Sequence, residues 1–258
     1  MMSWSRRLRS VAFNTLLESV RQKLFVAVVF FAFLLMIAAL VLKDISVHQD
    51  RKIIADIGLA AMDFFGTIVA VFIGADLVSK DLERRTLHLL LVKPLAREEY
   101  IVGRYLGLLA TIFTSLVLMS FGLSGALWTI GGSFGWSLAG AVYAIFLQLA
   151  LTGALATFFS TTSSRLLAIL GTTVMVILGR MTDVLKNAAL VVEGFPDWLG
   201  KGLYLILPNL LNFDLKNRAV YQDTFDLRLL MGLTAYAAAY ILALLSLGSL
   251  GFARRDLK

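Results

Sequence analysis

The stretch DLVSKDLERRTLHLLLVKPLAREEYIVGRYLG, residues 76–107, is a charged island between two long apolar segments. Its pattern predicts a helix, a break and a second helix. Three leucines share one face of the first helix: Leu87, Leu90 and Leu91. Pro94 ends that helix because proline has no backbone N–H to donate, and Glu98 and Glu99 follow in the first turn of the next, where the helix dipole favours carboxylates. We expect residues 76–104 to form a hairpin that offers an apolar ridge, framed by charge, to a partner outside the membrane.

The composition places most of the surface in contact with lipid. Of the 258 residues, 59% are hydrophobic and only 16% are charged, whereas a soluble domain carries about 25% charged residues. The chain has no cysteine, which excludes a disulfide scaffold, a thiolate metal site and a thiol nucleophile. The net charge of +7 does not indicate nucleic-acid binding, because the basic residues are scattered in short loops beside apolar segments.

Six apolar segments are candidates to cross the hydrocarbon layer, which is about 30 Å thick. They are residues 24–42, 57–75, 105–128, 138–159, 166–179 and 229–252. The fifth has only 14 uncharged residues before Arg180, a length that also suits a re-entrant or buried helix. We favour a span in which Arg180 snorkels to the interface. The sequence therefore predicts an all-α integral membrane protein with six transmembrane helices in one domain, residues 1–258.

Two further segments flank or interrupt these spans. In residues 1–23, apolar residues that include Trp4 recur at helical spacing, and basic residues lie on the opposite face. This pattern predicts an interfacial helix on the membrane surface, and an ordinary solvated helix is the alternative. Residues 181–226 are too apolar for a free loop. We expect them to form short helices at the outer face, with Pro196 and Pro208 marking their ends.

The basic residues predict the orientation. With the N-terminus in the cytoplasm, the inner segments hold fifteen of the 24 basic residues. Six of the other nine lie between positions 180 and 228, in a long outer segment where the positive-inside rule is weakest. We expect both termini to be cytoplasmic and the protein to lie in the inner (cytoplasmic) membrane.

The charged island carries a resemblance to a known family. In order, ERRTLHLLLVKPLAR supplies Glu83, Arg84, Thr86, Leu87, Leu90, Leu91, Pro94 and Arg97, and Gly103 and Arg104 follow. This stretch resembles the loop between the second and third helices of permease subunits of ABC transporters of the type-2 exporter class. Arg85 replaces the usual glycine and Ala96 a serine that would cap the second helix. LPNLLNFDLKN, residues 207–217, is similar to the subgroup linked to maturation of multicopper enzymes and nitrous-oxide reductase.

The resemblance implies a division of labour between subunits. Two permease protomers, as a homodimer, would pair with two cytosolic ATPase subunits, which bind ATP and Mg²⁺, so that this chain is not an enzyme by itself and binds no cofactor. The coupling residues would be Glu83, Arg84, Arg85, Thr86, Leu87, Leu90, Leu91, Pro94 and Arg97. The nearest approach to a phosphate loop, residues 194–202, has the wrong glycine spacing and lacks the final Ser or Thr.

Polar residues within the spans are candidates for the substrate path. Asp63 is the only acid well inside a span, and a charged carboxylate there costs about 2.5–3.5 kcal/mol. It lines the path or pairs with Arg180 in one interpretation, and is hydrated near the outer end of its helix in the other. Gln148 favours an interhelical hydrogen bond over a substrate contact, and Thr172 and Thr173 favour bonds to carbonyls of their own helix.

Other functions are less well supported by these residues. His48 stands alone in a loop, so no metal site is expected. An intramembrane enzyme would need an acid, a base and a nucleophile at one depth, and no span contains a histidine. An ion-coupled secondary carrier, or a membrane assembly subunit that transports nothing, remains the alternative to an exporter. The sequence identifies neither the substrate nor the direction of transport.

Overall fold

A computed structural model describes residues 4–42, 50–83, 97–132, 134–186, 207–221 and 226–253. Within these ranges every regular element is helical. The α-helices are α1 (Trp4–Val20), α2 (Lys23–Leu42), α3 (Asp50–Glu83), α5 (Arg97–Trp128), α6 (Trp136–Thr162), α7 (Arg165–Arg180), α8 (Thr182–Lys186), α11 (Lys216–Val220) and α12 (Leu227–Ala253), and η2 (Leu210–Phe213) is a 3-10 helix. The all-α prediction is confirmed for this part of the chain.

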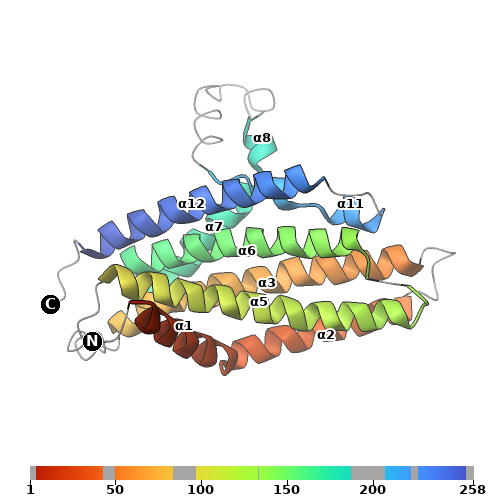
Figure 1. The fold of residues 1–258 in the computed structure, drawn as a ribbon, viewed down its shortest axis with the longest axis horizontal. Helices are drawn as coiled ribbons and strands as arrows, with labels where there is room; N and C mark the ends of the chain where they lie inside the picture. The colour runs from red at the N-terminus through yellow and green to blue at the C-terminus, as the bar shows by residue number, and fades with distance from the viewer. Residues whose placement is uncertain are drawn as a thin grey trace.

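The long helices run roughly side by side along one axis of the molecule (Figure 1). α3 ends, α5 begins and α12 ends at the same end of this bundle, which we call the hairpin end. α1 lies along α5 at that end, and α7 starts there as well. The predicted hairpin joins α3 to α5, but residues 84–96 lie outside the described residues. The sequence predictions for Arg84, Arg85, Thr86, Leu87, Leu90, Leu91 and Pro94 therefore stay predictions.

Four helices are long and apolar enough to cross a membrane: Asp50–Ser79, Glu99–Trp128, Trp136–Thr162 and Leu227–Gly251. A fifth candidate is formed by α1 and α2 together, which meet at an angle of 62°. α7 is 16 residues long and is not among these candidates. The part of the chain that the structure describes thus has four to five candidate spans, fewer than the six that the apolar segments predicted.

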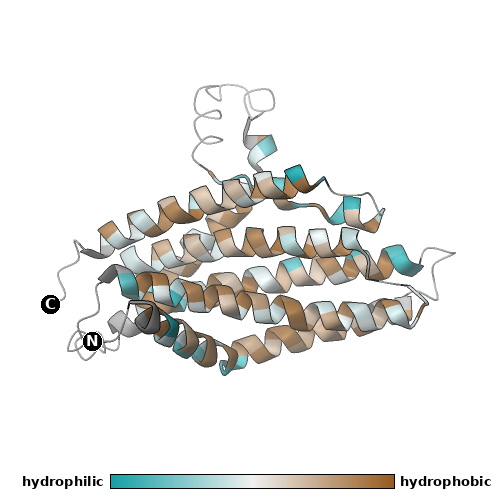
Figure 2. Cartoon of the chain, in the orientation of Figure 1, coloured by the Kyte–Doolittle hydropathy of each residue, from teal (hydrophilic) through white to brown (hydrophobic). Residues whose placement is uncertain are grey.

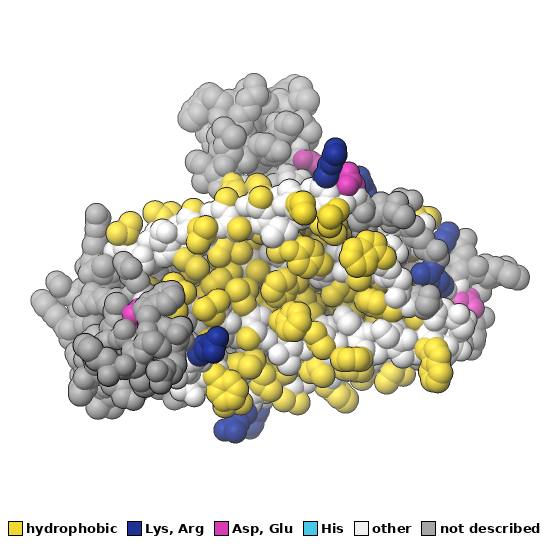
Figure 3. All heavy atoms as spheres, viewed as in Figure 1, with side chains coloured by type: hydrophobic (Ala, Val, Ile, Leu, Met, Phe, Trp, Pro, Cys, Tyr) yellow, Lys and Arg dark blue, Asp and Glu magenta, His cyan; other side chains and the backbone are white. Residues whose placement is uncertain are grey.

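The surface of the bundle is that of a protein surrounded by lipid. Figure 2 shows mostly hydrophobic residues along α2, α5 and α12. In Figure 3, hydrophobic side chains cover the middle of the visible face, and the Lys and Arg side chains lie toward its edges. Large apolar side chains point outward from three helices, with Phe31 54%, Phe121 69% and Leu242 66% exposed. Such a broad apolar exterior is stable only where water is absent.

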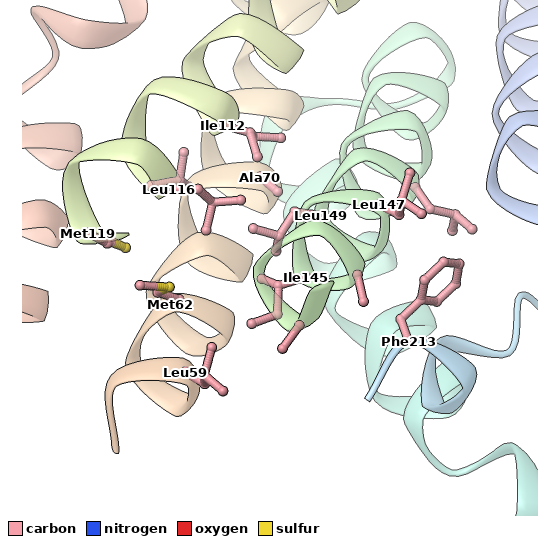
Figure 4. Packing of buried hydrophobic residues seen from close by; sticks show 14 of the residues in the cluster. Leu59, Met62, Ala70, Ile112, Leu116, Met119, Ile145, Leu147, Leu149 and Phe213 are labelled. Carbon is pink, nitrogen blue, oxygen red and sulfur yellow. The ribbon is translucent and has the colours of Figure 1, made fainter. Parts of the chain in front are cut away.

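The core lies where α3, α5 and α6 meet (Figure 4). Leu59, Met62, Ile112 and Met119 from α3 and α5 are fully buried there. Small residues let α3 approach α6 closely: a Cβ atom on Gly74 would lie 2.6 Å from the Cβ of Ala156, and one on Gly66 would collide with Leu149. The α3 glycines therefore serve packing within this chain.

The structure confirms that most of residues 1–23 form a helix, α1. α1 buries Leu8 and Thr15 against α5, while Phe13 is 59% exposed. The GxxxG pair of α5, Gly103 and Gly107, forms this contact, because Cβ atoms at these positions would collide with α1. α1 is thus helical and amphipathic, and it packs along α5 near the hairpin end.

Candidate functional site

Asp63 lies deep in the bundle. The sequence predicted that its helix begins at residue 57, but α3 begins at Asp50, so Asp63 is thirteen residues, or about 20 Å, from that end. Its partner on α6 is Gln148, the thirteenth of the 27 residues from Trp136 to Thr162. Asp63 is only 3% exposed. The interpretation that it is hydrated near the end of its helix is therefore wrong.

Four hydrogen bonds converge on the Asp63 carboxylate. Arg180 donates from Nη1 to Oδ2 over 3.0 Å and from Nη2 to Oδ1 over 2.7 Å. Lys216 donates from Nζ to Oδ2 over 2.7 Å, and Gln148 donates from Nε2 to Oδ1 over 2.8 Å. Each carboxylate oxygen thus accepts two bonds. The ion pair with Arg180 is the alternative that the structure shows, and the interhelical bond of Gln148 is confirmed.

The short helix α7 delivers Arg180 to this depth. Its 16 residues give a length of about 24 Å, so that α7, which starts at the hairpin end, stops near the middle of α6, and α8 leaves the bundle sideways from there (Figure 1). A cation in the last turn also suits the negative end of the helix dipole. Arg180 therefore does not snorkel from the far end of a span, as the sequence suggested; it pairs with a buried carboxylate.

The chain that follows returns into the bundle and supplies Lys216. Gly179 permits this, because a Cβ atom there would lie 2.8 Å from the carbonyl oxygen of Pro208. Asn209 then caps η2 by accepting a hydrogen bond from the backbone of Leu211 over 3.1 Å. Phe213 is fully buried beside Tyr236 of α12. Of the expected outer segment, the structure shows the short helices η2 and α11, which pack against α3, α6 and α7.

Lys216 was not among the candidates from the sequence. Its partner Asp63 is 153 residues away, so no local spacing could connect the two. One signal was available: Lys216 directly follows the mostly apolar stretch of residues 207–215 and is one of the basic residues that depart from the positive-inside pattern. A lysine in such a place needs either water or a buried anion.

A cavity of about 460 Å³ lies between α3 and α7 beside this cluster. Asp63, Arg180 and Lys216 line it, together with Thr173 and several apolar side chains. Two other candidates do not line it: Gln148 lies behind Asp63, and Thr172 is buried. The hydroxyls of Thr172 and Thr173 donate to Ala168 and Ile169 of their own helix over 2.7 Å and 2.8 Å, as expected from the sequence.

A second polar junction fastens α3 near the hairpin end. The Ser160 hydroxyl of α6 accepts hydrogen bonds from the backbone N–H groups of Val78 and Ser79 over 3.1 Å and 3.0 Å, and it donates to the carbonyl oxygen of Ala75 over 2.7 Å. Nearby, Arg165 of α7 forms an ion pair with Asp76 of α3 over 2.5 Å. The last turns of α3 are therefore joined to both α6 and α7.

The sequence profile of the ABC-2 family transporter proteins matches residues 9–257. The chain belongs to the ABC-2 family. It is the membrane permease component of an ABC transporter, and in this family the ATPase is normally a separate subunit. A comparison with curated proteins gave no match.

Family membership identifies the chain as a multi-pass membrane protein. The match includes the predicted hairpin, the cavity and the inserted segment of residues 207–216. It is a match to the family as a whole and does not reach the subgroup linked to metalloenzyme maturation. Among the described residues, no group of three or more His, Cys, Asp or Glu side chains could hold a metal ion. ABC-2 permeases typically carry no cofactor.

Proposed function

We propose that this permease is the membrane subunit of an ATP-driven exporter, in which two copies of the chain pair and two cytosolic ATPase subunits bind the hairpin of residues 76–104. The observation that carries the proposal is the continuity of α3, a single helix from Asp50 to Glu83. It links the cavity at Asp63 to the first residue of the coupling motif over 20 residues, about 30 Å. A push on the hairpin would thus reach the cavity through one rigid element.

The polar junctions at the hairpin end support this transmission. Because Ser160 and Arg165 fasten α3 to α6 and α7, a displacement of the end of α3 would also move α7. The cavity lies between α3 and α7, so its width would change with them. In this proposal the substrate passes Asp63, Thr173 and Arg180, with Gln148 and Thr172 as supporting residues behind the wall.

The proposed topology has six membrane helices, with α7 as a short fifth one. Both termini and the hairpin lie in the cytoplasm, and the chain resides in the inner membrane. The arrangement of the helices supports this, because α3 ends, α5 begins and α12 ends at one end of the bundle (Figure 1).

The test of the coupling role is a pair of leucine substitutions on the predicted ridge. Leu87→Asp together with Leu90→Asp should release the cognate ATPase subunits, because charges replace the apolar contacts that dock the hairpin. Co-purification of ATPase with tagged permease measures this release. The matched control is Leu89→Asp, which lies about 200° from Leu87 around the helix and should leave the complex intact. Undiminished co-purification and ATP-dependent transport in the double variant, with unchanged thermal unfolding, would rule out the coupling role.

A further inference from the structure

We propose that the cavity between α3 and α7 binds an amphiphile through its anionic group, with Arg180 and Lys216 as the partners of that group. The inference deepens the proposed function, since this cavity is the proposed substrate path. It names a chemical class of substrate: a carboxylate, phosphate or sulfate carried on an apolar body.

The cavity wall carries an excess of positive charge. Arg180 and Lys216 contribute two positive charges and Asp63 one negative charge, which leaves an excess of one positive charge. Asp214 offsets this excess only in part: its Oδ1 forms a longer ion pair with Lys216 Nζ over 3.8 Å, and its side chain is 42% exposed, so solvent screens the pair. Asp214 is exposed and is not part of the cavity wall.

Arg180 and Lys216 supply more hydrogen-bond donors than Asp63 can accept. The two oxygens of Asp63 already accept four bonds, so the carboxylate has little capacity for a further donor. A guanidinium has five N–H groups and an ammonium has three. Among the described residues, Arg180 uses three of its own on Asp63 and Thr67, and Lys216 uses one on Asp63. The unused donors can reach the cavity, because the Arg180 and Lys216 side chains are 38% and 19% exposed.

The rest of the cavity wall is mostly apolar, with Thr67 and Thr173 as its other polar residues. Phe64, Ile68, Phe72, Val176 and Ile177 form most of it. A net positive charge beside such a wall is poorly solvated, so an anion is favoured there and a second cation is opposed. The apolar side chains accommodate the body that carries the anion. Because the cavity of about 460 Å³ has its charge at one place only, an amphiphile fits it better than a small inorganic ion.

Four probes with the purified permease in an uncharged detergent test the class of ligand. Octyl phosphate should raise the thermal unfolding temperature in a saturable way. Octanol, octyltrimethylammonium and inorganic phosphate should raise it much less, since each lacks either the anion or the apolar chain. Equal stabilisation by octyltrimethylammonium or octanol would overturn the anionic assignment. Equal stabilisation by inorganic phosphate would overturn the amphiphile assignment.

A series of charge variants tests the residues. Lys216→Gln removes the excess charge and should weaken octyl phosphate binding roughly tenfold, whereas Asp63→Asn doubles the excess and should strengthen it. The double variant restores an excess of one and should bind like the original protein. The matched controls are Arg218→Gln, two residues along α11, and Asp56→Asn on α3; both side chains are exposed and neither lines the cavity. Equal affinity across the series would overturn the proposal.

The design separates this inference from the proposed function. Lys216→Gln leaves Asp63 paired with Arg180, so the series does not depend on a variant with an unpaired carboxylate. All binding measurements use the permease without its ATPase. Should the hairpin variants keep their ATPase while the charge series holds, the coupling role falls and the anion site stands. A flat charge series with an intact coupling result overturns the anion site alone.

Discussion

Near the hairpin end, one hydroxyl joins two long helices. Ser160 is fully buried, and its Oγ atom accepts two backbone N–H groups of α3 while it donates to the α3 carbonyl of Ala75. A hydroxyl has one donor and two acceptor positions, so all of them are used. The Ala75 carbonyl oxygen belongs to the backbone hydrogen-bond ladder of α3. A side chain that bonds into such a ladder is one of the causes of helix bending.

Replacing Ser160 by alanine should therefore lower stability. Backbone groups of α3 would lose a partner in a fully buried site, at a cost of roughly 1–3 kcal/mol. The midpoint of thermal unfolding in detergent measures the effect. The control is Ser246→Ala on α12, whose exposed hydroxyl donates only to Leu242 of its own helix; its midpoint should change little. Equal midpoints for the two variants would show that the Ser160 junction contributes no stability.

At the scale of the element, α1 can lie close against α5 because Gly103 and Gly107 of α5 have no side chains. A Cβ atom on Gly107 would lie 2.7 Å from the Ala12 carbonyl oxygen and would also collide with Thr15. A carbonyl oxygen in a helix cannot move aside as the end of a flexible side chain can. Arg104 adds an ion pair to Glu18 of α1 over 3.0 Å, but both groups are partly exposed, so this pair contributes little.

Gly107→Ala should push α1 away from α5 and destabilise the protein by about 1–3 kcal/mol. Gly125 on the same helix is a matched control, because a Cβ atom there meets nothing within 4 Å. Gly125→Ala should be neutral or stabilising by up to about 1 kcal/mol, since alanine is the better helix former. The thermal unfolding midpoints of the two variants test this prediction. Equal midpoints would show that the close contact between α1 and α5 does not contribute to stability.

At the scale of the whole molecule, the proposed topology can be tested directly because the chain has no cysteine. Thr129→Cys, in the exposed turn after α5, should react with a membrane-impermeant maleimide added to the outer side. Ser164→Cys, between α6 and α7, should not react until the membrane is opened. Ser164 makes no side-chain cap bond, so its replacement is mild. Labelling of Ser164→Cys by maleimide added outside would show that the protein has the opposite orientation in the membrane.

The sequence by itself determined the helical elements and flagged the polar position that matters. Long apolar runs predicted membrane helices because an unpaired backbone cannot exist in lipid, and α3, α5, α6 and α12 are long and apolar enough to cross a membrane. Asp63 stood out for a similar reason, because a carboxylate within a span is costly unless it is paired.

Only the tertiary structure decided what Asp63 pairs with and how deep it lies. Arg180 and Lys216 are 117 and 153 residues from it, and they reach it because α7 stops near the middle of the bundle and residues 207–216 return into it. Neither event has a local signal: a stretch of 14 uncharged residues suits a tilted span as well as a half-length helix. The buried carboxylate of Asp63 favours the half-length helix, because this arrangement brings Arg180 and Lys216 to it as cationic partners. These partners reach Asp63 only when distant segments of the chain fold together.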